Sequence, residues 1–142
     1  MGFAQPKAML ANGTIIRARF VKLDSTVNHA VIQAGTNDPI IGIAGDEART
    51  APTPDVGIDP YQAAQAGEMI DVHPNTSECL LEAGGTWLAG DRLTSDTNGK
   101  GVKNPKTGHP PRIGAIALTG ASSGELGLVQ VCIFDSVATA FT

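Results

Sequence analysis

Short runs of β-branched and aliphatic residues alternate with turn residues along most of the chain. The clearest run covers residues 14–23, where Arg17 and Arg19 would lie on one side of an extended backbone and Ile16 and Phe20 on the other. A period of two residues is typical of a strand with one buried face. Similar runs predict strands at 29–34, 40–45, 68–73, 78–82, 113–118 and 126–134, with short extended segments at 87–88 and 92–94.

The run at 126–134 is apolar on both faces. A strand of this kind is expected at the centre of a sheet or buried at an interface. Evenly spaced short strands with glycine-rich turns predict an all-β fold, namely a small barrel or sandwich of short antiparallel strands. The chain has no sustained helical period and no alternation of strands with helices, which argues against a doubly wound α/β fold.

Residues 46–67 interrupt the strand pattern with three prolines and Gly57. Asp59 and Pro60 suit the cap and the first position of a helix, and Gly67 suits its end. We therefore expect a Pro-rich surface excursion that carries a short helix.

The length of 142 residues fits one domain with its own core. We expect an extended N-terminal arm over residues 1–13, a single β domain over residues 14–135 and a C-terminal tail over residues 136–142. The arm is too polar and broken to fold alone, and arms of this kind are often ordered only against a neighbouring molecule.

Charge is distributed unevenly along the chain, although the net charge is only −4. Ten acidic residues and one basic residue lie between Asp38 and Asp91, whereas residues 100–112 are basic and contain no acid. This contrast could make neighbouring copies complementary, or folding could interleave the segments so that the contrast disappears. A nucleic-acid partner is not expected, because the chain has no overall basic character and the basic loop has no aromatic residue to stack on bases.

Residues with catalytic or metal-binding chemistry are scattered, and none of the common enzyme motifs occurs. His73 and Asp71 would share a strand face, but a metal site would need a further ligand that the sequence does not identify. Cys79 and Cys132 form neither a zinc motif nor a redox pair, and we expect both to be reduced. We therefore predict no catalytic, metal or cofactor residues and no enzymatic activity. No apolar run approaches the roughly 20 residues that span a bilayer, so no membrane partner is expected.

Several glycine-rich segments occur in a characteristic order. They are IIGIAG (40–45), AGE (66–68), EAGGTWLAGDRL (82–93), GKG (99–101), RIGAIA (112–117) and VQV (129–131). In this order they resemble segments of the small capsid decoration, or cement, proteins of tailed phages of the DUF2190 kind. The resemblance covers roughly residues 14–134, and the long excursion and the N-terminal arm depart from it.

This resemblance implies a β-rich structural subunit on the outer surface of a phage head, commonly a trimer, with no catalytic residues. We accordingly expect a virion protein that is made in the host cytoplasm and stabilises the capsid by bridging major capsid proteins. Its expected partners are the major capsid protein and further copies of itself in a homotrimer. The alternatives are another virion component, such as a head fibre base or a tail part, or a small β-barrel ligand-binding module.

We predict contact regions where apolar residues lie in irregular segments and where basic residues gather in a loop. Trp87, beside a Gly-Gly turn, is expected in the core, with an interface anchor as the alternative. The hypothetical capsid or intersubunit contacts are Phe3, Pro6, Met9, Leu10, Tyr61, Lys100, Lys103, Lys106 and Arg112.

Overall fold

The computed structural model describes residues 6–36, 38–45, 62–104 and 112–135. Within these ranges the chain forms short strands and no helix, so the predicted all-β class is confirmed. The first strands in chain order are β1 (Lys7–Ala11), β2 (Ile15–Ile16), β3 (Phe20–Leu23), β4 (Ala30–Gln33), β5 (Ile40–Ala44), β6 (Gln62–Ala64) and β7 (Met69–His73). The remaining strands are β8 (Glu78–Glu82), β9 (Arg92–Ser95), β10 (Gly101–Lys103), β11 (Arg112–Ala117) and β12 (Leu126–Asp135).

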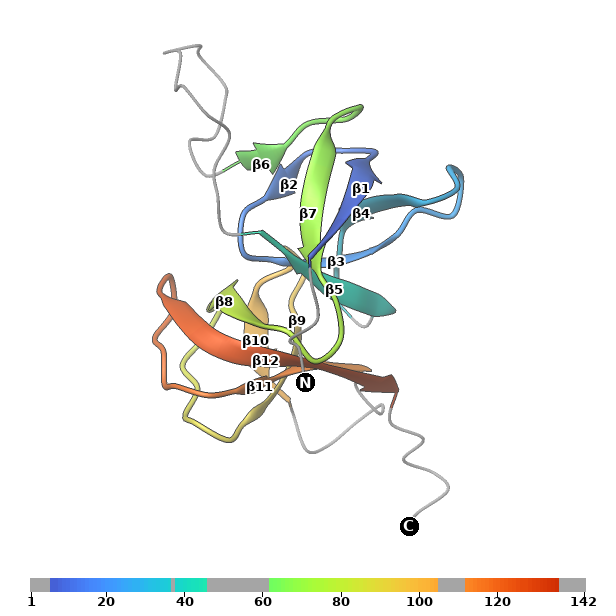
Figure 1. Cartoon of the computed structure of the whole chain (residues 1–142). Coiled ribbons are helices and arrows are strands. Elements are labelled where there is room, and N and C mark those ends of the chain that lie inside the picture. Colours follow the sequence, from blue (N-terminus) through green and yellow to red (C-terminus); the bar gives the residue numbers. More distant parts are fainter. Residues whose placement is uncertain (1–5, 37, 46–61, 105–111, 136–142) are drawn as a thin grey trace, which may run out of the picture.

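A closed barrel is formed by five of these strands in the order β1-β4-β3-β5-β7 (Figure 1). β1 pairs in parallel with β4, and the other pairs are antiparallel. The interior is filled by small and branched aliphatic side chains, among them Ile15, Val21, Val31 and Val72. A two-stranded sheet of β2 and β6 lies at the upper end of the barrel in Figure 1.

A second sheet lies below the barrel in Figure 1 and has the strand order β10-β9-β11-β12-β8. Its two edges meet at one end, because Gly84 donates its N–H to Gly101 O at 2.8 Å and Ala83 bridges to Gly101. The curled sheet encloses Trp87, which is 1% exposed. The indole Nε1 donates to Thr119 O at 2.8 Å, so the polar end of the buried ring has a partner. The expected core role of Trp87 is confirmed.

Besides the cluster inside the barrel, the barrel and the second sheet share a second buried cluster, which we call the shared core. Phe20 and Ile40 from the barrel wall pack in the same buried cluster as Leu81 and Val129 of the second sheet. The approach is close at Gly114 in β11, where an added Cβ would lie 2.5 Å from Phe20 Cε1. The second sheet therefore buries its inner face partly against the barrel wall, whereas the barrel interior has a cluster of its own.

Three local expectations are corrected by the structure. Lys7–Ala11 were assigned to an extended arm, but they form β1, because their main chain pairs with β4 and β7 and thereby closes the barrel. The strand expected over 14–23 is divided into β2 and β3, with Ala18 between them in the left-handed region at φ 55°. The basic loop expected over 100–112 contains β10, which pairs with β9.

The helix expected within 46–67 is not supported. Residues 46–61 lie outside the described residues, and Gln62–Ala64 form strand β6. β6 pairs with β2, and Ala64 is buried in the barrel core. Pairing and burial therefore outweigh the helix propensity of the two alanines.

Candidate functional site

The predicted contact residues near the N-terminus lie in or beside the barrel wall. Pro6 is exposed just before β1. Met9 packs against the barrel core, and Leu10 is half-buried opposite Met69 of β7. Phe3 lies outside the described residues. The structure therefore gives Met9 a packing role and leaves Pro6 and the outward side of β1 at the surface.

The predicted basic contact residues lie in the second sheet, away from β1. Lys100 Nζ lies 3.5 Å from Glu82 Oε2, and Lys103 Nζ lies 3.9 Å from Asp91 Oδ1. Arg112 begins β11, and its carbonyl oxygen accepts a hydrogen bond from Thr94. Tyr61 and Lys106 lie outside the described residues. The predicted contacts thus do not form one site, and two of the lysines have acidic partners within the chain.

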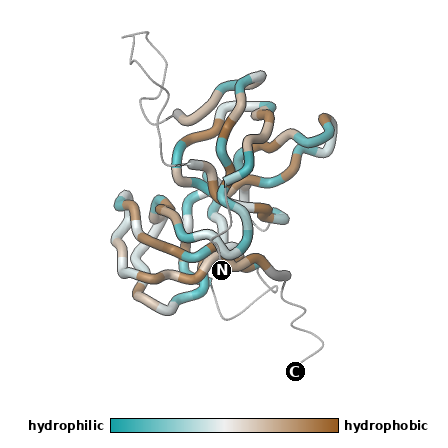
Figure 2. Tube along the Cα trace, in the orientation of Figure 1, coloured by the Kyte–Doolittle hydropathy of each residue, from teal (hydrophilic) through white to brown (hydrophobic). Residues whose placement is uncertain are grey.

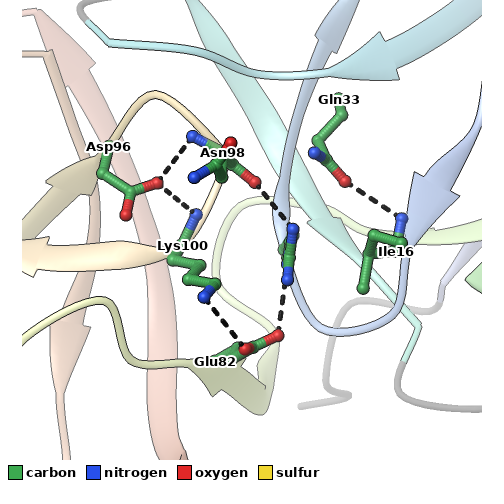
Figure 3. A network of polar contacts seen from close by, with 7 residues as sticks. Ile16, Gln33, Glu82, Asp96, Asn98 and Lys100 are labelled. Atoms are coloured by element: carbon green, nitrogen blue, oxygen red, sulfur yellow. Dashed lines mark hydrogen bonds and ion pairs between the residues drawn. The ribbon is translucent and has the colours of Figure 1, made fainter. Parts of the chain in front are cut away.

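A polar network joins the barrel to the second sheet (Figure 3). Arg19, between β2 and β3, donates from Nε to Glu82 Oε1 at 3.1 Å and from Nη1 to Asn98 O at 3.2 Å. Asp96 orders the adjoining turn by accepting the N–H groups of Asn98 and Lys100 at 2.8 and 2.9 Å. The network fixes the orientation of the two sheets at the edge of their shared core.

The acidic middle of the chain is interleaved with the basic segments. Besides the pairs of Glu82 and Asp91, Asp38 Oδ2 lies 2.9 Å from Lys22 Nζ and accepts the Gly35 N–H at 2.7 Å. Burial works to raise the pKa of Asp38, but the bonds from Lys22 and Gly35 outweigh it and hold that pKa below its usual value. At these positions the acidic and basic residues therefore pair within the chain, which is the second of the two alternatives given by the sequence.

The described residues contain no group of three or more His, Cys, Asp or Glu side chains placed to hold a metal ion. Cys79 is buried, Cys132 is half-buried, and both are free thiols, as expected. The described part of the chain also contains no helix long and apolar enough to cross a membrane.

One surface was missed by the list of predicted contacts, namely the outward face of the second sheet. Leu80, Leu128 and Leu118 form a cross-strand row on this face, because Leu128 is paired with Leu80 and its carbonyl accepts the Leu118 N–H at 2.9 Å. Ile116 and Leu126 extend the row on either side, and all five are at least partly exposed. We call these five residues the leucine face. The sequence signal was the run at 126–134, which is apolar on both faces; Figure 2 shows the hydrophobic colour along β12.

The architecture has a counterpart among solved structures. It is similar to the structure of the N base of the head fibre protein gp8.5 of bacteriophage phi29, with a TM-score of 0.61 and 16% sequence identity. The match covers 89% of this chain and 92% of that chain. At this identity the similarity shows a shared fold alone. No family model matches the chain, and no curated protein matches it in sequence.

Proposed function

We propose that this chain is a structural, non-enzymatic protein of a phage virion. It binds the outer surface of the capsid and stabilises the shell by bridging neighbouring major capsid proteins. The observation that carries the proposal is the fold similarity to a head fibre base, which extends over nearly the whole of both chains. The order of the glycine-rich segments, which resembles decoration proteins of the DUF2190 kind, supports the same role.

The physical design of the body suits this role. A barrel and a sheet that share a buried cluster, with a polar network across their junction, make a stiff unit. A stiff unit loses little conformational freedom on docking, so more of its contact energy is retained as affinity. Repetition over many copies then multiplies a modest contact area into a large stabilisation of the shell. We further propose that the copies form a homotrimer on the shell.

The test compares phage heads assembled with and without this chain. We expect heads that lack it to rupture at lower temperature and in milder osmotic shock, and purified protein added back to restore the threshold. Equal rupture thresholds together with no binding of the added protein would contradict the proposal.

Salt dependence tests how the subunit is held on the shell. Lys100 and Lys103 are paired within the chain, so we expect occupancy on heads to persist when salt is raised to about 1 M, where charges are screened beyond about 3 Å. Release of the protein by salt would show instead that exposed charges hold it.

A second candidate is the base of a head fibre, which the structural similarity to the phi29 protein favours specifically. The two candidates differ in what the subunit does for the head. If the chain is a fibre base, its removal abolishes a projecting fibre and leaves the rupture threshold unchanged. If it is a cement subunit, its removal lowers the threshold.

A further inference from the structure

We propose that the leucine face is the surface through which copies of this chain associate with one another. The face lies on the interior strands β11 and β12 of the second sheet and on its edge strand β8. The inward side chains of these strands fill the shared core. Leu80, Leu128 and Leu118 therefore stand on a fixed platform, where Leu118 is 38% exposed and the other two are partly exposed. Contiguous apolar surface of this kind marks interaction sites in proteins.

A second row of side chains crosses the same face next to Leu80, Leu128 and Leu118. The residues at the two ends of this second row identify the partner. Register places Glu78 of β8 beside Gln130 of β12, then Ile116 of β11, then Arg92 of β9. The row thus begins with an exposed carboxylate and ends with an exposed guanidinium. Neither Glu78 nor Arg92 forms an ion pair with another described residue, unlike Glu82 and Lys100 close by.

Opposite charges at the two ends of one row are complementary to a rotated copy of the same row. When copies are arranged about a rotation axis that runs along β12, each copy turns its β8 side toward the β9 side of the next. Glu78 of one copy then faces Arg92 of its neighbour, and the leucines of the copies pack together around the axis. The same pairing arises for two or three copies, because closed rings repeat one contact.

A second copy of this chain is therefore the occupant that the charges favour. A shell protein would need a matching leucine surface and a matching charge row, whereas another copy supplies both by symmetry. Self-association through this face is independent of what the assembly binds. The number of copies, three, rests on the proposed function. The choice of this surface for self-association does not depend on it.

The experiment measures the mass of the purified full chain by sedimentation equilibrium, from micromolar to millimolar concentration. We expect a mass that is a multiple of 14.6 kDa for the wild type. Leu128→Asp places an unpaired carboxylate at the centre of the face and should weaken association at least about 100-fold. The matched control Leu23→Asp changes a leucine that is 51% exposed on β3 of the barrel, and it should leave the mass unchanged.

A charge exchange tests the orientation of the copies. Glu78→Arg alone and Arg92→Glu alone should each weaken association about 5- to 10-fold, because like charges then meet. The double variant should restore the affinity to within about threefold of the wild type. Near-UV circular dichroism of Trp87 confirms that each variant is folded.

Three results would overturn the inference: a wild type that stays at 14.6 kDa throughout, an oligomer that Leu128→Asp leaves intact, or a double exchange that restores nothing. Binding of the variants to phage heads is measured separately. Monomeric Leu128→Asp that still binds heads would leave the proposed function standing while confirming the self-association surface. A wild-type oligomer that fails to bind heads would contradict the proposed function and leave the self-association surface standing.

Discussion

Adding one methyl group at Gly127 tests the packing that holds the second sheet together. An alanine Cβ at this position would lie 2.9 Å from Trp87 Cζ2 and 3.0 Å from Ala121 Cβ. Carbon atoms in van der Waals contact are about 3.5–4.0 Å apart, so roughly 0.5–1 Å of overlap must be relieved. We expect Gly127→Ala to destabilise the fold.

The overlap has no easy release, because the ring is held at several points. Trp87 Nε1 donates to Thr119 O at 2.8 Å, and its backbone pairs with Ala121 in both directions, at 2.9 and 3.1 Å. Overpacking a core of this kind costs about 1–3 kcal/mol. For a chain of this size that corresponds to a fall in Tm of roughly 3–10 °C.

The assay is thermal unfolding followed by circular dichroism, with Gly120→Ala as the matched control. A Cβ at Gly120 would be 3.4 Å from Trp87 O and meet nothing closer, so its Tm should change by no more than about 2 °C. Trp87→Phe removes the ring atom that the new methyl group meets, so the double variant should lose less stability than the sum of the two single changes. Equal melting temperatures for Gly127→Ala and Gly120→Ala would refute the reasoning.

Three further changes probe the barrel and the junction. Glu82→Gln weakens the network between the two sheets, so the free energy of unfolding, measured with denaturant, should fall by about 1–2 kcal/mol. The control Asp71→Asn, at an exposed position in β7, should lower it by less than about 0.5 kcal/mol. The lowered folded pKa of Asp38 adds stability that is complete above the unfolded value of about 3.9 and is lost as pH falls through the folded value. Stability curves between pH 5 and pH 2 should therefore be flatter for Asp38→Asn, and parallel curves would contradict this. Gly42→Ala sets a Cβ against the backbone oxygen of His73, which cannot move aside. We therefore expect the free energy of unfolding to fall by about 2 kcal/mol or more. A variant that melts like the wild type would contradict the barrel geometry.

Strands whose own residues supply a buried apolar face were predictable from the sequence. The runs at 40–45, 68–73 and 78–82 correspond to β5, β7 and β8 within a residue at each end. In each of them the apolar residues needed for one face are present locally, so a window of a few residues contains the necessary information.

Elements that depend on distant partners were not predictable in this way. Lys7 and Ala8 are exposed in β1, so they show no buried face, and the strand exists because β4 and β7 leave a gap that it fills. The break at Ala18 has the same origin, since Glu82 donates its N–H to Ala18 O at 2.8 Å across the junction. Pairing over more than sixty positions leaves no trace in local periodicity.

The candidate surfaces show a similar division. The segment of Lys100 and Lys103 contains no acid and so predicts contacts with another molecule, but folding brings Glu82 and Asp91 to these lysines. The leucine face was indicated in part, since the run at 126–134 was expected to be central or at an interface. Its row of charges depends on register across four strands, which the sequence alone does not give.

We propose that this β body binds the outside of a phage capsid, and a cryo-electron microscopy map of the phage particle tests this proposal most directly. We expect density for the barrel and the curled sheet on the outer capsid surface, in contact with at least two neighbouring major capsid proteins. Density for the same body in the tail or inside the head, or its absence from the particle, would contradict the claim.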